Sequence, residues 1–480
     1  MRPNILFVIS DDQSYPHASA YGFKAVRTPA FNRVAREGIL FTNAFSASPG
    51  CSPSRAAILT GMNCWQVQEA GTHASTFPAD LTTYTGLLER AGYHVGMTQK
   101  GWGPGKVVGR DNNPAGKAYN KRRLESPQNI NDNDYAANFE DFLADRTEGQ
   151  PFCFWFGAAE PHRRYPTGIG VESGMKLGDV KVPGFLPDVP EVKSDMLDYL
   201  YEIQWQDNHL DRMVKSLEAM GELENTLIVV TSDNGMPFPR AKANCYEYGI
   251  HMPLAIRWGE KIKGGRTVDD LVSLVDMAPT FLAAAGVDAP EIIGMAGKNL
   301  MRVLTSEKSG TIDRERSAVY ASRERHSSSR WNNLGYPQRA MRTADHLYIW
   351  NIHPERWPAG DPQKFEEDGS LGPVHGGYHD INEFDESVLN LRRDDPAISN
   401  YFHMAVDKRP EVELYDIRKD PYCLKNLANE TAYQSTRENL GNQLLAYLKK
   451  TNDPRLGPEG EKTYENYKRY SPIRTFPELK

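Results

Sequence analysis

The sequence lacks any apolar run long enough to cross a membrane, and it has few cysteines. A transmembrane helix needs about 18 or more consecutive apolar residues, whereas the apolar runs here have the length of strands, such as NILFVIS at 4–10. The five cysteines are odd in number and do not have the spacing of a zinc site or a disulfide framework. We therefore expect no membrane span, no structural zinc and no disulfide scaffold.

The sequence also lacks an excess of positive charge. Asp and Glu number 63 against 56 Lys and Arg, which gives a formal net charge of −7. Because a non-specific nucleic-acid-binding protein is normally basic, we expect no nucleic acid among the partners. A local basic pocket could still bind an anionic substrate, since net charge does not describe a single site.

The chain of 480 residues is too long for one core of typical size, so more than one domain is expected. In its first two-thirds, apolar runs alternate with helical patterns, which favours an α/β fold with a large, mostly parallel sheet covered by helices on both faces. The strand candidates are 4–10, 151–159, 227–232 and 252–258. Apolar residues at helical spacing predict a helix over 196–220, which ends at Gly221.

The pattern of predicted secondary structure changes after about residue 335. The stretches 338–352 and 412–421 are typical of strands in a smaller antiparallel sheet, and 436–453 has the spacing of an amphipathic helix. We therefore predict a first domain over 1–335 and a C-terminal α+β subdomain over 336–480.

Two of the predicted strands run directly into polar residues that suit a metal ion. Asp11 and Asp12 follow the first strand, and Asp233 and Asn234 follow the strand at 227–232. Ligands of open parallel sheets collect at the carboxyl ends of strands, and clustered carboxylates need a cation to offset their repulsion. An all-oxygen set suits Ca²⁺ or Mg²⁺. Either pair alone would be an ordinary turn, but the two together favour a metal site.

Cys51 lies at the start of a predicted helix in SPGCSPSRAAILTG, residues 48–61. Pro53 suits the first turn of that helix, and Gly61 suits its end. The positive end of the helix dipole would stabilise negative charge near residue 51, and Arg55 lies within one turn. A lone cysteine is usually a structural thiol, and the alternative is the reactive centre of an enzyme.

Several blocks together resemble one enzyme family. CSPSR followed by LTG is similar to the C-x-P-S-R…T-G signature of the type I, formylglycine-dependent sulfatases. Further similar blocks occur in the family's order along nearly the whole chain: NILFVISDD, TPAFNRVAREGILFTNAF, LLERAGYHV, LIVVTSDNGMPFP, LVDMAPTFLAAAG and ELYDIRKDPYCLKNLA. Within the family, the chain looks most like heparan N-sulfatase (sulfamidase) and its bacterial relatives. The resemblance implies an alkaline-phosphatase-like fold.

The resemblance also implies two cofactors. Cys51 would be converted to formylglycine (3-oxoalanine), either by a formylglycine-generating enzyme or by an anaerobic sulfatase-maturating enzyme. The hydrated aldehyde would attack sulfur and later expel sulfate through its second hydroxyl. One Ca²⁺ per chain would be held, together with a sulfate oxygen, by Asp11, Asp12, Asp233 and Asn234.

Four further positions match catalytic residues of the family. By this resemblance Arg55 holds the formylglycine diol, while Lys100 and Lys242 contact the sulfate oxygens. His162, in AAEPHRR, would protonate the departing oxygen or nitrogen. Cations that neutralise the sulfate oxygens and an acid for the leaving atom are what this reaction needs.

One position departs from the family pattern. The family's G-K-x-H block has a histidine two residues after the lysine, whereas QKGW places Trp102 there. His73 or His251 would be a replacement for that histidine, and Trp102 would instead form a wall for a sugar ring.

Other cationic residues are candidates for substrate binding. They are Arg163 and, within SRERHSSSR at 322–330, Arg323, His326 and Arg330. The latter stretch is interpreted as a subsite for a further anionic sugar group, with an exposed charge cluster as the alternative. Two stretches without a clear period, 103–140 and 353–400, are long enough to be functional loops or insertions.

The expected function is hydrolysis of sulfate ester or sulfamate groups on a sulfated polysaccharide or oligosaccharide. A heparan-type glycan and an algal galactan of the carrageenan type are both candidate substrates. The alternatives are a phosphonate or phosphodiester hydrolase of the same superfamily and a catalytically silent glycan-binding protein. The resemblance favours a periplasmic or secreted protein whose leader is absent from this chain, with the cytoplasm as the alternative. The oligomeric state does not follow from the sequence.

Overall fold

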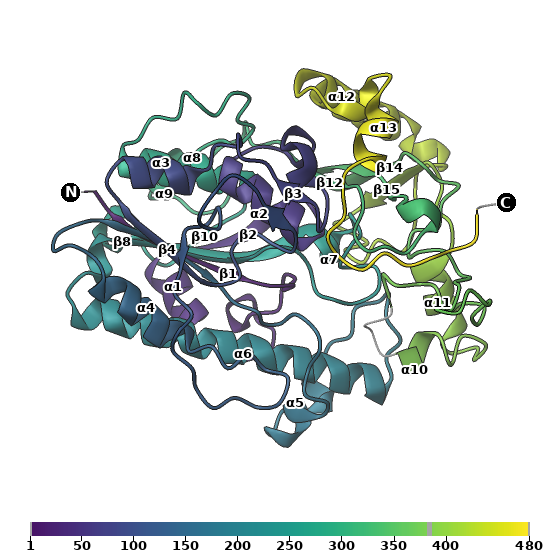
Figure 1. Ribbon diagram of the computed structural model, residues 1–480, viewed down its shortest axis with the longest axis horizontal. Helices are drawn as coiled ribbons and strands as arrows, with labels where there is room; N and C mark the ends of the chain where they lie inside the picture. Colours follow the sequence, from purple (N-terminus) through teal and green to yellow (C-terminus); the bar gives the residue numbers. More distant parts are fainter. Residues whose placement is uncertain (1, 382–385, 479–480) are drawn as a thin grey trace.

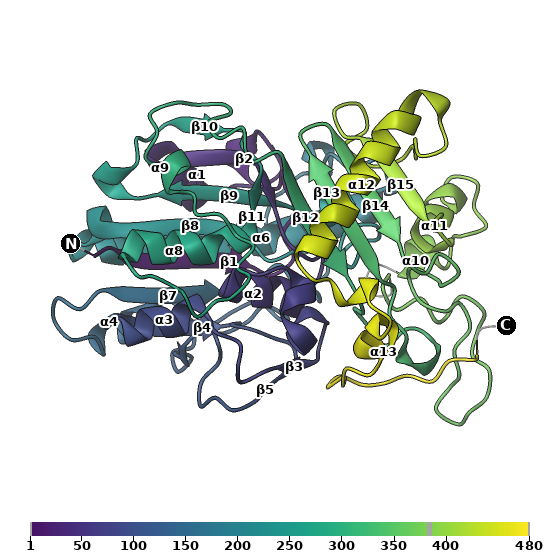
Figure 2. The ribbon, with the colours of Figure 1, turned by 90° about the horizontal axis from the view of Figure 1, so that it is seen from above.

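A computed structural model describes residues 2–381 and 386–478 of the chain. Residues 382–385, which belong to the stretch 353–400 singled out in the sequence, lie outside the described residues. A large sheet between two layers of helices forms one part of the molecule, and a smaller sheet with its own helices forms the other (Figures 1 and 2). Within the described residues, no helix is both long and apolar enough to cross a membrane.

The large sheet has the strand order β10-β2-β9-β8-β1-β7-β4-β6, and β11 pairs with β2. The bounds of its central strands are Asn4–Ser10 for β1, His94–Gln99 for β4, Phe152–Gly157 for β7, Thr226–Ser232 for β8 and His251–Arg257 for β9. Those of its outer strands are Ile39–Phe45 for β2, Lys117–Ala118 for β6, Arg266–Val268 for β10 and Val272–Ser273 for β11. All four predicted strands are therefore present, in a mostly parallel sheet of the kind predicted.

Strand β9 differs from its neighbours in direction, because it runs antiparallel to both β8 and β2. The chain returns from β8 through residues 233–250 and the short helix α7 (Glu247–Ile250), without a long crossover helix. An apolar run shows that a strand is buried on both faces but does not show which way the strand points. The direction of β9 was therefore not accessible from the sequence.

The two faces of the large sheet are packed against different helices. Along β1, Ile5, Phe7 and Ile9 face one apolar cluster, whereas Leu6 and Val8 face the other. The helices on the first face are α2 (Cys51–Thr60), α3 (Tyr84–Arg90), α8 (Met277–Ala285) and α9 (Met301–Leu304). Those on the second face are α1 (Pro29–Glu37), α4 (Tyr135–Ala144) and α6 (Pro190–Ala219) (Figure 1). The core of the protein lies in these two layers.

Helix α6 confirms and extends the helix predicted over 196–220. It begins earlier, with Pro190 in its first turn, where a missing N–H leaves no helical hydrogen bond unmade. Gly221 follows its end with a φ of 70°, a left-handed conformation that glycine adopts without steric cost. The glycine therefore terminates the helix as the sequence indicated.

The smaller sheet is antiparallel and has the order β12-β13-β14-β15. Its strands are Ala318–Arg323, Gln338–Thr343, His346–Asn351 and Val412–Asp416. The predicted strand region 338–352 is thus a hairpin, and β12 lies upstream of the predicted boundary at residue 335. The helices of this part are α10 (Glu386–Leu389), α11 (Ser399–Val406), α12 (Gln434–Lys450) and α13 (Gly460–Glu465). The remaining short elements are α5 (Ile169–Glu172) and the strand pair β3 (Thr76–Phe77) and β5 (Lys106–Val107).

A buried ion pair joins the two parts of the molecule. Arg342 of β13 binds both carboxylate oxygens of Glu247, in α7, at 2.9 Å. Burial disfavours the charged carboxylate, but Arg342 and His251 outweigh it and lower the pKa of Glu247 to about 2. His251 lies 3.2 Å from the same carboxylate. The pair fixes the loop that follows β8 against the smaller sheet.

We expect Arg342→Met to destabilise the protein strongly, because it leaves the Glu247 carboxylate buried without its guanidinium. The free energy of unfolding in urea should fall by about 3–5 kcal/mol, and the double variant with Glu247→Gln should recover part of that loss. Because the folded-state pKa of Glu247 is lowered, the contribution is present above its ordinary value of 4.5 and is lost as the pH falls toward 2.

The matched control is Arg418→Met, which removes an ion pair with Asp345 at a largely exposed position. Its effect should stay below about 1 kcal/mol. Equal losses in the Arg342 and Arg418 variants would contradict the role assigned to the buried pair.

Candidate active site

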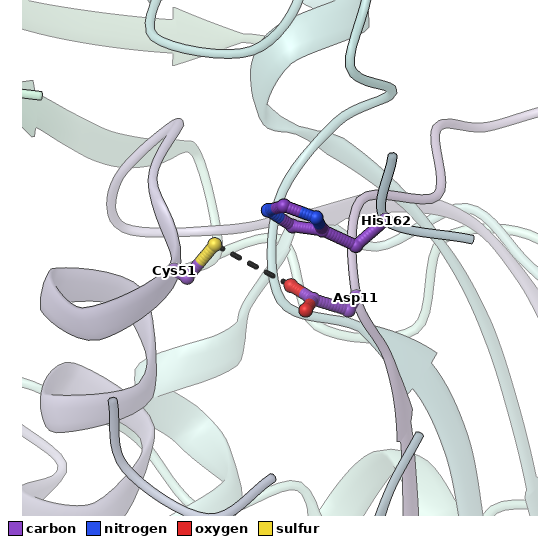
Figure 3. Close-up of side chains that lie close together, drawn as sticks. All are labelled: Asp11, Cys51 and His162. Atoms are coloured by element: carbon purple, nitrogen blue, oxygen red, sulfur yellow. Dashed lines mark hydrogen bonds between the residues drawn. The ribbon is translucent and has the colours of Figure 1, made fainter. Parts of the chain in front are cut away.

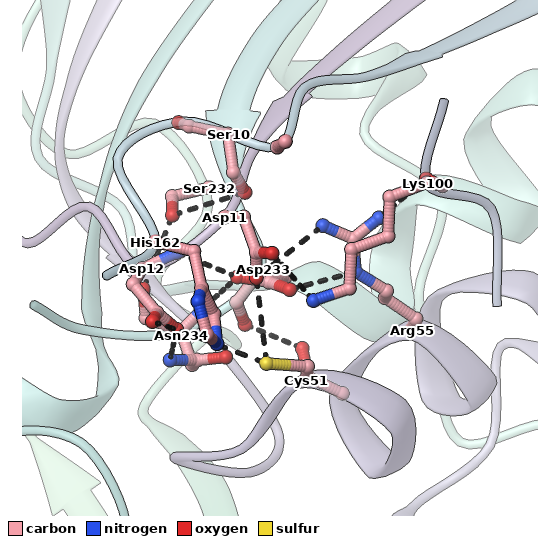
Figure 4. Close-up of polar contacts among 12 residues, drawn as sticks. Ser10, Asp11, Asp12, Cys51, Arg55, Lys100, His162, Ser232, Asp233 and Asn234 are labelled. Carbon is pink, nitrogen blue, oxygen red and sulfur yellow. Dashed lines mark hydrogen bonds and ion pairs between the residues drawn. The ribbon is translucent and has the colours of Figure 1, made fainter. Parts of the chain in front are cut away.

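The acidic residues predicted as metal ligands meet at the ends of two neighbouring strands. β1 and β8 are parallel and in register, with Ser10 beside Ser232, so the residues that follow them emerge side by side. Asp11, Asp12 and Asp233 each place a carboxylate oxygen within 4.8 Å of the other two (Figure 4). The backbone N–H groups of Asp12 and Asn234 both donate to Asp233 Oδ1, at 3.1 and 2.8 Å. The sequence-predicted cluster is therefore formed.

Each of the three carboxylates has its own cation. Lys100 Nζ lies 2.5 Å from Asp11 Oδ2, and Lys242 Nζ lies 2.5 Å from Asp12 Oδ2. The third carboxylate, of Asp233, accepts from Arg55 Nε at 2.7 Å. These cations come from the end of β4, from the loop after β8 and from α2. Ion pairs with the acidic cluster therefore connect three segments of the chain.

The pKa values of two of these carboxylates move in opposite directions. Burial opposes ionisation of Asp11, but the charges of Lys100, His162 and Arg55 outweigh it and hold its pKa well below the usual range. Burial dominates at Asp233 and raises its pKa to about 6, although Arg55 acts in the other direction. The cations thus do not fully offset the cost of burying this cluster.

The donor set fits a hard divalent cation. It consists of three carboxylates and the side-chain oxygen of Asn234, and oxygen ligands of this kind are those that Ca²⁺ and Mg²⁺ prefer. Asn234 Oδ1 is buried and has no hydrogen-bond partner among the described residues, while its Nδ2 donates to Asp12 Oδ1 at 2.7 Å. A buried acceptor without a partner next to three carboxylates is the arrangement that a cation would satisfy.

Cys51 is the first residue of α2 and points at the acidic cluster (Figure 3). Its Sγ donates to Asp11 Oδ1 at 3.4 Å and lies 3.8 Å from Asp12 Oδ1. Burial and the neighbouring charge of Asp11 raise the pKa of the thiol well above its ordinary value. A helix N-terminus normally favours a thiolate, but here the carboxylates act against it. The unmodified thiol at this position is therefore a poor nucleophile.

Arg55 connects α2 to the residues after β4. Its Nη1 donates to the carbonyl oxygens of Lys100, at 2.7 Å, and Gly101, at 3.1 Å. Its Nη2 lies 3.9 Å from Asp11 Oδ1 and has no hydrogen-bond partner within the part of the chain that the structure describes. One nitrogen of this buried guanidinium is thus left beside the carboxylate that Cys51 contacts.

His162 lies on the other side of the cluster, in the segment after β7 (Figure 3). Its ring shares a group of three possible ligands with Asp11 and Cys51, whose atoms lie within 4.8 Å of one another. The Nδ1–H donates to the carbonyl oxygen of Arg163 at 2.6 Å, and Nε2 lies 3.8 Å from Asp12 Oδ2. Because Nδ1 is engaged with the backbone, Nε2 is the nitrogen that can exchange a proton at the site.

A cavity of about 250 Å³ opens directly above Cys51. Cys51, His162 and Lys242 line it together with His73 and His326, whose ring centroids are 4.5 Å apart. Two of the weaker sequence candidates, His73 and His326, therefore lie at the same cavity as Cys51.

The remaining candidates lie elsewhere. Arg163 is bound to Asp195, with Nη1 2.7 Å from Oδ1, and lines a neighbouring cavity with Lys100. Trp102 also borders that neighbouring cavity, but it is 4 % exposed and its indole N–H donates to the Ser52 carbonyl at 2.9 Å. The tryptophan thereby supports the first turn of α2.

His251 is stacked between other aromatic rings, with centroids 4.0 Å from Tyr15 and 4.6 Å from Phe45. It makes a 2.8 Å hydrogen bond with the Thr42 carbonyl. Neither cavity beside the acidic cluster has His251 among its lining residues.

Arg323 and Arg330 are buried and share one carboxylate, that of Asp380. Their Nη2 atoms lie 2.6 and 3.3 Å from Asp380 Oδ2, and His326 Nδ1 lies 3.1 Å from Oδ1. Burial opposes ionisation of Asp380, but Arg323 and His326 hold its pKa well below the usual range. The two arginines thus position Asp380 at the cavity.

Three charged residues that line the cavity were not among the sequence candidates: Asp380, Arg469 and Arg474. Asp380 falls in the stretch 353–400, whose length and lack of period pointed to a functional loop. Arg469 and Arg474 lie near the C-terminus, where no motif or periodicity marked them.

The fold and this site define the class of the protein. A mostly parallel sheet between helices, with an acidic cluster at the strand ends and a smaller antiparallel sheet beside it, is the alkaline-phosphatase-like arrangement expected from the resemblance. The sulfatase family profile matches residues 3–287, and a profile for the C-terminal region of N-sulphoglucosamine sulphohydrolase matches residues 241–334. The chain belongs to the sulfatase family and is a sulfuric ester hydrolase.

Known relatives resemble nearly the whole chain. An ulvan-active sulfatase of Formosa agariphila is 27% identical over 487 residues, covering 96% of this chain and 77% of the relative. Human N-sulphoglucosamine sulphohydrolase is 27% identical over 501 residues, covering 95% and 92%. Among solved structures, BT4656 in complex with its substrate D-glucosamine-2-N,6-O-disulfate has a TM-score of 0.67 at 22% identity, with 94% and 99% covered. This last similarity concerns the fold.

We expect Ca²⁺ to stabilise the protein through the acidic cluster. At about 100 times its dissociation constant, the ion should raise the free energy of unfolding by about 2.7 kcal/mol. Asp233→Ala should lose this increment, and Asn234→Ala, which keeps all three carboxylates, should reduce it. Thermal unfolding with added Ca²⁺ and with a chelator measures the difference.

The control is Asp188→Ala, which removes a largely exposed carboxylate paired with Lys193. It should keep the full increment. An increment of the same size in Asp233→Ala and Asp188→Ala would show that the ion binds elsewhere.

Proposed function

We propose that this sulfatase removes sulfate groups from a sulfated glycan, using a formylglycine made from Cys51 and a Ca²⁺ ion. The observation that carries the proposal is the position of Cys51. It begins a helix at the floor of a cavity and faces the acidic cluster, with Lys242 and His162 beside it. Formylglycine and calcium are features of the family, and the glycan is suggested by the names of the relatives described above.

The place of Cys51 at the acidic cluster and the CSPSR motif support a chemical conversion of this residue. Burial and the charge of Asp11 raise the pKa of the thiol, so these surroundings do not favour its thiolate. A formylglycine hydrate supplies a hydroxyl nucleophile that needs no thiolate. The maturating enzyme would act on CSPSR before or during folding, since Cys51 is 1 % exposed in the folded chain.

The two lysines are placed to bind the sulfate. Lys100 pairs with Asp11, and Lys242 pairs with Asp12. A bound cation would neutralise the carboxylates and attract a sulfate oxygen. The ammonium groups would then turn to the other sulfate oxygens, where they offset the charge that the transition state concentrates. Arg55 Nη2 is placed to hold the hydrated form of residue 51.

His162 would protonate the leaving atom. It lines the cavity, and its Nδ1 is engaged with the backbone, so Nε2 faces the site of reaction. No histidine stands at position 102, and of the two replacements considered from the sequence only His73 lines the cavity with Cys51. We therefore propose His73 rather than His251 as the second proton-transfer group.

The cavity above Cys51 has room for about one sugar ring, because its volume of about 250 Å³ is below the range of most ligand sites. The adjoining cavity of about 790 Å³ shares His162 with it and has room for further sugar units. The relatives point to two glycan types, an N-sulfated glucosamine and a sulfated ulvan. Both are therefore the first substrates to test.

We expect Cys51→Ala and Cys51→Ser to abolish sulfate release while leaving the thermal unfolding curve close to that of the wild type. Mass spectrometry of the peptide that contains residue 51 should show the aldehyde in protein co-expressed with a maturating enzyme. Sulfate release from N-sulfated glucosamine and from ulvan oligosaccharides is then measured by ion chromatography.

Other results would overturn the proposal. Turnover of phosphodiesters or phosphonates in preference to sulfates would assign the chain a different hydrolase activity. An unmodified Cys51 in a competent host, without turnover of any sulfated sugar, would indicate a silent glycan-binding protein.

We expect His162→Ala to affect poor leaving groups most. A sugar sulfate should lose about 10²- to 10⁴-fold in kcat, the usual contribution of a general acid. An aryl sulfate with an acidic phenol as leaving group needs little protonation and should lose much less. Equal losses for the two substrates would exclude His162 as the acid.

A further inference from the structure

The C-terminal tail segment, residues 467–476, returns from α13 to the catalytic cavity. It is drawn in yellow and leaves α13 toward the junction of the two sheets before it reaches the C-terminus (Figures 1 and 2). Arg469, Ser471 and Arg474 of this segment line the same cavity as Cys51. The tail therefore forms part of the wall opposite the large sheet.

Hydrogen bonds hold the tail in this place at several points. The Tyr470 N–H donates to the Ala74 carbonyl at 2.7 Å, next to His73. Further along, the Arg474 N–H donates to Ser328 Oγ at 3.2 Å. Phe476 is 3 % exposed and packs edge-on against the His379 ring, with centroids 5.9 Å apart. The cavity-lining arginines thus belong to a fixed wall of the site.

Arg469 has a hydrogen-bond donor that is not used within the described residues. Its Nη1 donates to the His326 carbonyl at 2.7 Å, whereas its Nε is buried and has no hydrogen-bond partner among the residues that the structure describes. Burial and the charge of Arg325 lower the pKa of Arg469 to about 10, with Asp380 acting in the other direction and Arg474 adding a smaller lowering effect. An anion bound beside it would relieve both the unmade hydrogen bond and the repulsion between cations.

Among the described residues that line the cavity, Asp380 is the acidic one, and its charge is already compensated. Arg323, Arg330 and His326 bind its two oxygens, and Ser327 Oγ donates to it as well. Arg469 of the tail lines the same cavity, and none of these contacts to Asp380 comes from it. Within the described residues, the charge of Asp380 is therefore compensated without Arg469.

We propose that Arg469 binds a second anionic group of the substrate, separate from the sulfate that is removed. This inference rests on the proposed function, because it assigns a place to the rest of the sugar whose scissile sulfate lies above Cys51. The group is an oxyanion, either a second sulfate or a uronate carboxylate, since both accept hydrogen bonds from a guanidinium. The chain would thus select glycan units that carry two negative charges.

The test compares substrates that differ by one charge. D-Glucosamine 2-N,6-O-disulfate is compared with D-glucosamine 2-N-sulfate, and a sulfated, uronate-bearing ulvan disaccharide with its carboxyl-reduced form. For each pair, the ratio of kcat/KM between the doubly and singly charged substrate is measured in the wild type, Arg469→Ala and Arg469→Lys. The pair that shows selectivity identifies the second anion as sulfate or carboxylate.

We expect Arg469→Ala to lower that ratio about tenfold or more, with little change for the singly charged substrate. Arg469→Lys should keep part of the selectivity because it keeps the charge. Arg418→Ala, which removes an exposed arginine outside the cavity, is the matched control and should leave the ratio unchanged. A variant of Arg469 that lowers kcat/KM equally for both members of each pair would overturn the subsite while the sulfatase function stands.

A binding measurement tests the proposed subsite independently of catalysis. Calorimetry with Cys51→Ala as the parent chain, with and without Arg469→Ala, measures the affinity for the same compounds without turnover. Charge-selective binding that depends on Arg469, in the absence of turnover by the wild type, would support the subsite and refute the proposed function. Neither turnover nor selective binding would refute both.

Discussion

Repulsion among three buried carboxylates is the constraint on which the rest of this structure depends. Asp11, Asp12 and Asp233 lie side by side because two parallel strands, β1 and β8, end in register. Such a cluster is tolerated only when positive charge is brought to it. The chain supplies one cation to each carboxylate, from β4, from the loop after β8 and from α2. The raised pKa of Asp233 shows that this compensation is incomplete, and the same imbalance is what makes the cluster suited to a divalent ion.

The chemistry at Cys51 follows from the same charges. The field that would hold a cation also suppresses the thiolate, so the residue at the start of α2 is unsuited to ordinary thiol catalysis. The lysines that balance Asp11 and Asp12 are in turn the groups best placed for sulfate oxygens. In the proposed mechanism, structural compensation and substrate binding would use the same side chains, and His162, at the edge of the cluster, would add proton transfer.

The second part of the molecule closes the site from the side of the sugar. The buried pair between Arg342 and Glu247 fixes the smaller sheet to the loop after β8. From this part come Asp380, held by two buried arginines, and the tail with Arg469. In the proposed function, the reaction would depend on the large sheet, whereas the groups that would distinguish one sugar from another come mainly from later in the chain.

The sequence by itself determined the local features: the buried strands, the helix at Cys51, the acidic strand ends and the motifs that identify a sulfatase. These are encoded by neighbouring residues, in apolar spacing and in short motifs. Only the tertiary structure decided the direction of β9, the burial of Arg323 and Arg330 against Asp380, and the presence of His73 rather than His251 at the cavity. It also brought Arg469 from the C-terminal tail to Cys51. The physical reason is that such contacts join residues tens to hundreds of positions apart, and no local pattern records which distant charge a side chain will meet.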